Sequence, residues 1–372
     1  MGERMLSFTR RLSTHFRKTD AALLLVSAFA LFCSSLAYYL DGRQILQLPT
    51  LEREQVLLMT LPFSLWLASI VALMMRRGYE RPLRIVLRLL RRDPFWLVRA
   101  AALLLIISGT ARAYTAFKLQ IPQIQPFYAD PIIANIEATL FGQDPWRLTH
   151  AVFGVQGTVV LDRIYVIWFP VSAFLVTWAT MTRDRVFQAR AVAAMFFVWF
   201  VLGNFVALAF SSAGPVYYEH FYGDDRFAPL IETLRAYHEQ VNVRAIVLSD
   251  WLISDEDAGK LGKGISAMPS VHVGMTFVTW LLVQSRLGWK NPVSAIVAIY
   301  VAAIWVGSVH LAWHYWLDGA VSIAATALFW KATGLWLKPK AAPSQSAQPA
   351  PRAARPETPD LPEGVQAGQA AQ

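Results

Sequence analysis

The stretch PVSAIVAIYVAAIWVGSVHLA, residues 292–312, decides the fold. It contains no Asp, Glu, Lys or Arg. A helix needs about 20 apolar residues to cross the ~30 Å hydrocarbon core of a membrane. The length and composition of this stretch therefore predict a membrane-spanning helix.

Seven further stretches have the same character, and the overall composition agrees with them. Of the 372 residues, 55% are hydrophobic and only 16% are charged, and the mean hydropathy is +0.39. A soluble domain of this length carries more surface charge. We predict an all-α fold, a polytopic membrane helix bundle of about eight transmembrane helices, the first of them uncleaved. The predicted spans are Ala21–Leu40, Gln55–Met75, Phe95–Phe117, Val159–Thr182, Phe187–Phe210, Ala267–Ser285, Pro292–Ala312 and Leu317–Leu337.

The positive charge lies in alternate connections between these spans. The net charge is +9, and the Arg-rich segments are the N-terminus, the connection at 76–92 and the turn after the fourth span. This is the positive-inside pattern, so both termini are predicted to be cytoplasmic. The connections at 118–158, 211–266 and 311–316 then face outward. Nucleic-acid binding would need a basic face on a folded soluble unit, and the sequence contains no such unit.

Two segments outside the spans have a recognisable character. DPIIANIEATLFGQDP, residues 130–145, places apolar side chains at helical spacing and predicts a short helix in the outer membrane interface. From residue 338 the chain has seven prolines and no aromatic residue, which predicts a disordered cytoplasmic tail. The single cysteine, Cys33, cannot form an intrachain disulfide.

The segment SAMPSVH, residues 266–272, enters the sixth predicted span from the outside. Pro269 suits the first turn of a helix, and Ser266 is a potential cap for that helix. Ser270 and the free backbone N–H groups would then face outward at a helix N-terminus, which is partly positive and binds phosphate. His272 lies one turn in and reaches the same place. No GxSxG elbow accompanies the Ser–His pair, so the segment predicts an anion site with a proton donor rather than a serine hydrolase.

The segment HLAWHYWLD, residues 310–318, lies at the same outer boundary. His310, His314 and Asp318 are four apart, which predicts that they share one helical face. Asp318 would accept a hydrogen bond from one nitrogen of His314 and leave the other as nucleophile or base. His314 would attack a phosphoryl group held by Ser270, His272 would protonate the departing oxygen, and His310 would support His314.

A metal site is the alternative interpretation of these histidines. His310 and His314 have an i, i+4 ligand spacing, and His272 or Asp318 would complete the site. A Ser-bearing helix start suits an oxyanion better than a zinc ion. We therefore expect a reaction without a metal or another cofactor.

The pattern resembles the type 2 phosphatidic acid phosphatase superfamily of membrane phosphatases and phosphotransferases. Its second motif, Pro-Ser-x-His, is matched by Pro269, Ser270 and His272, and the end of its third, His-x-x-x-Asp, by His314 and Asp318. The resemblance covers the third to the eighth span and implies a six-helix core. It divides the chain into an N-terminal pair of helices with the Arg-rich loop (1–94), a catalytic membrane domain (95–337) and a tail (338–372).

Two departures from the family pattern point to one branch of it. The first motif, Lys-x6-Arg-Pro, is not found, and Gly307 and Ser308 stand where the third motif usually has Ser-Arg. GISAMPSVH, SSAGPVYY and HYWLD are instead similar to the branch related to inositol phosphorylceramide synthase and sphingomyelin synthase. That inositolphosphotransferase-like branch transfers a phospho-headgroup between lipids.

The resemblance implies a catalytic set and leaves the phosphate-binding cations open. His314 would be the nucleophile, Asp318 its orienting partner and His272 the acid–base residue. The candidate substrate-binding residues are Ser270, Lys263, His310, Arg163 and Arg112. The implied substrate is a phospholipid or polyprenyl phosphate, with water or a second lipid as acceptor. We expect the periplasmic face of a bacterial inner membrane.

A function of another class remains open. A non-catalytic lipid-binding membrane protein, or a transporter that uses the histidines as a proton relay, would also place ionisable groups in the membrane. Transporters tend to place such groups at the bilayer midplane. The predicted position at the outer boundary favours an enzyme.

Overall fold

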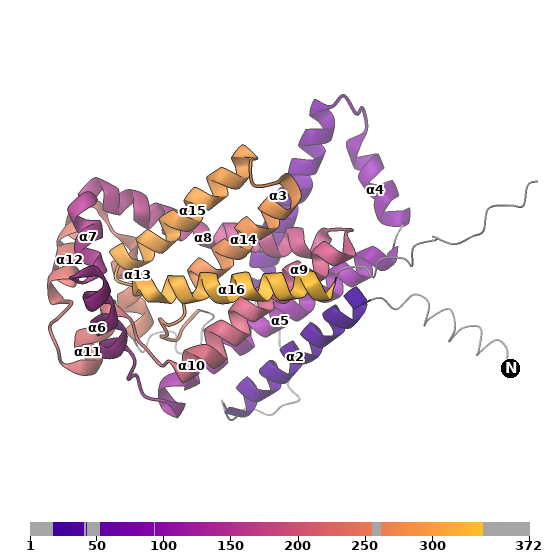
Figure 1. Ribbon diagram of the computed structural model, residues 1–372. Coiled ribbons are helices and arrows are strands. Elements are labelled where there is room, and N and C mark those ends of the chain that lie inside the picture. The colour runs from indigo at the N-terminus through magenta and orange to yellow at the C-terminus, as the bar shows by residue number, and fades with distance from the viewer. Residues whose placement is uncertain (1–17, 41, 43–52, 93, 255–261, 338–372) are drawn as a thin grey trace, which may run out of the picture. The chain divides into compact units, whose positions relative to one another are not determined.

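The computed structural model describes residues 18–40, 42, 53–92, 94–254 and 262–337, and within these it omits some side chains, that of Arg112 among them. Every regular element in this part of the chain is a helix (Figure 1). These described residues, up to Leu337, form one compact unit. The predicted all-α fold is confirmed for the described residues, while the predicted tail and the N-terminal arginines lie outside them.

Each of the eight predicted spans overlaps a helix, and the sixth, Ala267–Ser285, begins four residues before its helix does. The helices are α2 (Lys18–Leu40), α3 (Arg53–Arg76), α5 (Pro94–Ile124), α8 (Val155–Met181), α9 (Arg185–Phe196) continued by the π-helix η1 (Phe197–Val206) and α10 (Ala207–Ala209), α14 (Val271–Leu287), α15 (Pro292–His310) and α16 (Trp316–Trp336). Five helical stretches among the described residues are long and apolar enough to cross a membrane. They are Lys18–Leu40, Phe95–Ile124, Val155–Met181, Arg185–Ala209 and Pro292–His310. The count of eight and the six-helix core remain predictions.

Small residues allow the long helices to pack closely around α9 and η1. Ala189, Ala191 and Ala194 of α9 are fully buried. A Cβ atom at Gly274 of α14 would lie 2.9 Å from the Val198 side chain of η1, so only glycine permits this approach. Helix interfaces in membranes favour small residues for this reason. The contact fixes α14, and with it the segment that precedes its first turn.

The three C-terminal helices pack side by side and reverse direction twice. α14 contacts α15 and α16, and α15 also packs against α8 (Figure 1). Asn291 caps α15 by accepting a hydrogen bond from Val293 N at 2.9 Å, and Pro292 occupies its first position. The beginning of α14, the end of α15 and the beginning of α16 therefore meet at one end of these helices.

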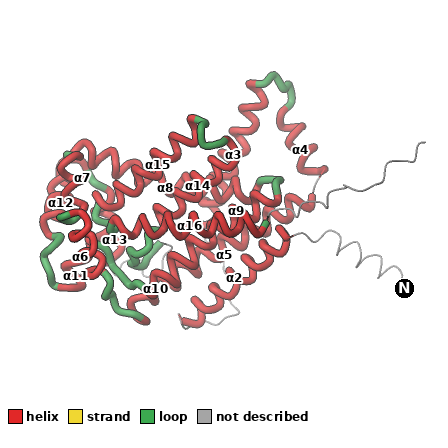
Figure 2. Tube along the Cα trace, viewed as in Figure 1, coloured by secondary structure: helices red, strands yellow, loops and turns green. Residues whose placement is uncertain are grey.

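Short helices and most of the described connections gather at that end (Figure 2). They are α6 (Asp130–Phe141), α7 (Pro145–Val152), η2 (Pro215–Tyr217), α11 (Tyr218–Tyr222), α12 (Ala228–Val241) and α13 (Arg244–Ile253). Arg226 joins several of these segments, because its guanidinium donates to Asp144 at 2.6 Å and to the Ala134 carbonyl at 2.9 Å.

The predicted short outer helix is α6, and its two faces are clearly separated. Asp130 and Glu137 are buried, with 0% and 2% of their surface exposed. Ile132, Ile136 and Leu140 are exposed instead. The acidic side chains of α6 thus face the protein together with Ile133, and the other isoleucines and Leu140 are on its exposed face.

Candidate active site

The first turn of α14 begins one residue after Ser270. The Ser270 hydroxyl oxygen accepts a hydrogen bond from Val273 N at 3.3 Å and is the N-cap, a position that the sequence had suggested for Ser266. Ser270 is fully buried, and its own N–H donates to the Asp318 carbonyl at 3.1 Å. The bond ties the starts of α14 and α16 together. The hydroxyl proton of Ser270 is still available to donate to a phosphate oxygen.

The segment that carries His314 is a tight link and not a helix. α15 ends at His310 and α16 begins at Trp316. The Ser308 carbonyl accepts from both Trp313 N (2.9 Å) and His314 N (3.1 Å), and Ala312 has a φ of +64°. His310, His314 and Asp318 therefore do not share one helical face. The prediction failed because a non-glycine residue at positive φ is uncommon and has no sequence signal here.

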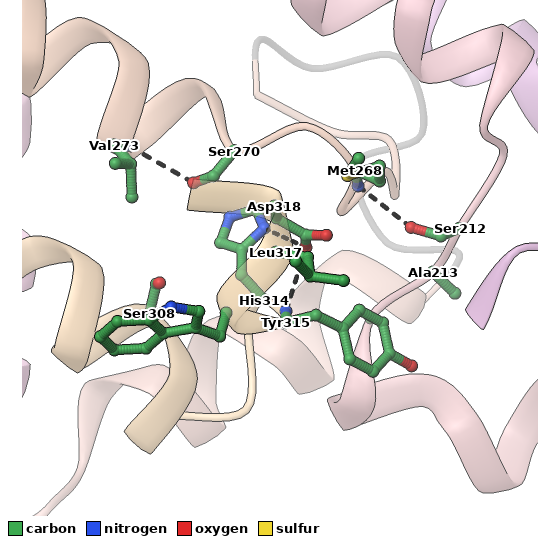
Figure 3. Close-up of polar contacts among 12 residues, drawn as sticks. Ser212, Ala213, Met268, Ser270, Val273, Ser308, His314, Tyr315, Leu317 and Asp318 are labelled. Carbon is green, nitrogen blue, oxygen red and sulfur yellow. Dashed lines mark hydrogen bonds and ion pairs between the residues drawn. The ribbon is translucent and has the colours of Figure 1, made fainter. Parts of the chain in front are cut away.

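His314 and Asp318 nevertheless lie together (Figure 3). His314 Nδ1 is 3.2 Å from Asp318 Oδ2, and the same oxygen accepts from Tyr315 N at 3.0 Å. With the proton assigned to Nδ1, the second ring nitrogen, Nε2, carries the lone pair. Burial lowers the pKa of His314, and the charge of Lys118 acts in the same direction. A neutral imidazole in this environment is a nucleophile.

His272 is on the first turn of α14, and its ring lies next to the ring of His314. The two ring centroids are 6.0 Å apart, a separation that one phosphoryl group placed between the rings can span. Tyr165 and Trp168 of α8 flank the His272 ring at 4.8 and 4.3 Å. Trp168 Nε1 also donates to the His272 carbonyl at 3.1 Å, and this bond holds the Trp168 indole against the first turn of α14.

His310 belongs to a second, separate cluster. Its Nε2 is 2.8 Å from Thr158 Oγ1 and its Nδ1 is 3.1 Å from Thr149 Oγ1. Its ring stacks on His150 at 3.9 Å. The structure therefore does not bring His310 to His314, as the metal alternative required. Among the described residues, no group of three or more His, Cys, Asp or Glu side chains is placed to hold a metal ion.

Two of the cations suggested by the sequence, Lys263 and Arg163, contact other groups. The Lys263 ammonium donates to the carbonyls of Trp251 and, at 2.9 Å, Ser254, and lies over the Trp251 ring. Arg163 pairs with its neighbour Asp162 at 3.3 Å. The side chain of Arg112 lies outside the described residues. None of these observations tests a role in substrate binding.

Among the side chains that the structure describes, Lys118 of α5 is a cation near both histidines, and the sequence interpretation missed it. Its charge acts on His272 and on His314. Gly264, at φ +100°, lets the segment before α14 lie directly on Lys118, since a Cβ atom there would be 3.2 Å from Lys118 Cγ. The loop that carries the second motif thus packs on this lysine.

A sequence signal for Lys118 exists. Gln125 and Pro126 follow it at the spacing of Lys-x6-Arg-Pro, with Gln in place of Arg. The Gln125 carbonyl accepts from Ser211 Oγ at 2.9 Å, which joins the end of this segment to SSAGPVYY. Because Gln125 stands where the motif has its arginine, the pattern Lys-x6-Arg-Pro does not identify Lys118.

The SSAG segment, residues 211–214, connects the parts of the site. Ser212 accepts from Ala267 N at its carbonyl (2.9 Å) and from Met268 N at its hydroxyl (3.0 Å; Figure 3). Asp130 of α6 accepts from Gly214 N at 2.7 Å and from the Tyr315 hydroxyl at 3.0 Å. Burial raises the pKa of Asp130, and these hydrogen bonds oppose that rise. The sequence had marked Asp130 only as a residue of the outer helix.

Comparison with known proteins agrees with this geometry. A family model described as the PAP2 superfamily matches residues 132–332, more than half of the chain. The chain belongs to the PAP2 superfamily. The matched range runs from α6 to α16 and contains the two PAP2 motifs around His272 and His314, whereas Lys118 precedes it. No curated protein and no solved structure matches the chain. Membership in the PAP2 superfamily, with the apolar helices, indicates a membrane protein with phosphatase-type chemistry on lipid phosphates.

Proposed function

We propose that the protein hydrolyses or transfers a lipid phosphate headgroup through a phosphohistidine formed on His314. The observation that carries this proposal is the pair His314 Nδ1–Asp318 Oδ2 at 3.2 Å, with the ring of His272 6.0 Å away from that of His314. Membership in the PAP2 superfamily supports the same reaction class.

In the first step, His314 Nε2 attacks phosphorus and the bond from phosphorus to the leaving oxygen breaks. The proton for that oxygen comes from His272. Asp318 accepts from Nδ1–H and stabilises the positive charge that develops on the ring. Lys118 neutralises charge on the phosphoryl oxygens, and the Ser270 hydroxyl donates a hydrogen bond to one of them.

In the second step, a hydroxyl oxygen attacks the phosphohistidine and the nitrogen–phosphorus bond breaks. His272 takes the proton of that hydroxyl and returns to its starting state. Water gives hydrolysis, and a second lipid gives transfer. Gly307 and Ser308, together with Gln125 in the first motif, favour the branch related to inositol phosphorylceramide synthase and sphingomyelin synthase. We therefore favour a phospholipid or polyprenyl phosphate donor and a lipid acceptor.

The proposed site faces the outer side of the membrane. The Arg-rich connection at 76–92 supports a cytoplasmic location for the opposite side. In a bacterial-type cell this places the reaction on the periplasmic face of the inner membrane. The proposed catalytic domain is 95–337, preceded by the N-terminal helices and followed by the tail.

The test is turnover of labelled phosphatidic acid, polyprenyl diphosphate and phosphatidylinositol by purified protein. His314→Ala is expected to lower kcat at least roughly 1000-fold, because the covalent route is lost. A ³²P-phosphoprotein that is labile in acid and stable in base should form in the wild type and be absent from the variant. His220→Ala, on an exposed ring, is the matched control. Full turnover by His314→Ala would remove the proposed nucleophile.

A further inference from the structure

Helix α16 carries Asp318 as its third residue, and the Asp318 carboxylate accepts from the N-cap N–H of Tyr315 at 3.0 Å but leaves the N–H groups of the first turn to other acceptors. The residue at the N-cap position is Tyr315 and not Ser, Thr, Asp or Asn. The first N–H groups of a helix have no partner within it, so they need acceptors from elsewhere. The first turn of α16 is also the element that places Asp318 against His314.

Glu137 supplies the missing acceptor from α6. Its Oε1 accepts from Leu317 N at 2.6 Å. Only 2% of Glu137 is exposed. A buried acceptor 180 residues away in the chain thus does what an N-cap side chain ordinarily does.

Two carboxyl groups therefore meet at the start of α16, and they do different things. Asp318 Oδ2 accepts from His314 Nδ1 and from Tyr315 N, which both belong to the tight link between α15 and α16. Glu137 binds the adjacent N–H of Leu317 from outside that link. We propose that Glu137 is a positioning residue, which holds the first turn of α16 so that Asp318 stays in place against His314. This inference rests on the proposed function of His314.

The charges around Glu137 provide a pH-dependent readout. Burial, followed by the charges of Asp318 and Asp144, raises the pKa of Glu137 to about 8. Asp144 is paired with Arg226 at 2.6 Å. Ionisation of Glu137 above pH 8 adds a negative charge beside Asp318, which opposes the binding of an anionic phosphate.

Two substitutions separate positioning from simple packing. Glu137→Gln keeps an oxygen that accepts from Leu317 N and cannot ionise, whereas Glu137→Ala removes the cap. With dioctanoyl phosphatidic acid as probe, we expect Glu137→Ala to lower kcat at least 10-fold and to change KM less than 3-fold. Glu137→Gln should retain at least half of the wild-type kcat at pH 7 and lose the decline in kcat/KM near pH 8. The exposed Glu239→Gln is the matched control.

A readout without turnover keeps this inference separate from the proposed function. In ¹⁵N-histidine NMR spectra, the Nδ1–H signal of His314 should be well defined in the wild type and in Glu137→Gln, and broadened or shifted in Glu137→Ala. Absence of turnover by wild-type protein on every lipid phosphate would count against the proposed function alone. A wild-type kcat, pH profile and His314 signal in Glu137→Ala would overturn the positioning role.

Discussion

At the residue scale, the proposed chemistry of the site depends on keeping His314 neutral while an anion binds beside it. Burial lowers the pKa of this imidazole and favours the unprotonated ring. Asp318 fixes the tautomer through Nδ1. The anion then needs a cation that is not already used elsewhere, and Lys118 is the one whose charge acts on both histidines.

Replacing Lys118 by Met removes the charge and keeps most of the side-chain volume. We predict a loss of roughly 100-fold in kcat/KM on lipid phosphate, because one charge-assisted bond to the phosphoryl oxygens is lost. Lys118→Arg should recover part of this loss. Lys290→Met, at an exposed turn, is the control and should behave like the wild type. Steady-state kinetics that give equal kcat/KM for Lys118→Met and wild type would assign the phosphate to another cation.

The candidate site residues that could be predicted from the sequence are those in short motifs, where the spacing along the chain itself indicates which side chains are close. His272, His314 and Asp318 were predicted to lie together, and the structure places them together. Lys118 was missed because its motif carries Gln125 in place of arginine. Asp130 was missed for a different reason: its partners Gly214 and Tyr315 are distant in sequence, and no local pattern encodes such a contact.

At the element scale, α6 shows that a helix can be predicted correctly while its orientation stays undetermined. Its apolar spacing predicted the helix, which the structure confirms, and its location in the outer membrane interface remains a prediction. Periodicity does not tell whether Asp130 and Glu137 face water or protein, since both choices give the same pattern. Their burial follows from the N–H groups that they accept, at Gly214 and Leu317, which only the folded chain brings near.

Because Glu137 is buried, it should also make stability depend on pH. Its pKa is raised from 4.5 to about 8 on folding. Between these values the unfolded chain has lost this proton and the native state retains it, so stability falls as pH rises and levels off above about 8. We predict that the melting temperature of the wild type, relative to Glu137→Gln, falls by several degrees between pH 5 and pH 8.

Thermal unfolding of both proteins in the same detergent, at several pH values in this range, measures that difference. Glu239→Gln corrects for a general effect of losing one acidic group. A melting-temperature difference that stays constant across the range would mean that Glu137 titrates normally and is not held as the structure describes.

At the scale of the whole molecule, helix directions place the site at one end of the C-terminal helices. α14 runs away from Ser270 and ends at Leu287, and α15 returns to His310 beside the site. The turn between these two helices, residues 288–291, must then lie at the opposite end from the tight link that carries His314. Eight spans and cytoplasmic termini were predicted from charge and hydropathy, and five of the helical stretches meet the length and hydropathy of a span.

The chain is well suited to a direct test of this orientation, because Cys33 is its single cysteine and only 2% of it is exposed. Glu219, on α11 just after SSAGP, is exposed on the side of the site, and Lys290 is exposed on the opposite turn. We predict that a membrane-impermeant maleimide labels Glu219→Cys in intact right-side-out vesicles, and labels Lys290→Cys only after detergent is added. Wild-type protein should remain unlabelled in both conditions because Cys33 is buried. The reverse pattern would place His314 on the cytoplasmic side, where the acceptor would be a cytosolic or inner-leaflet molecule.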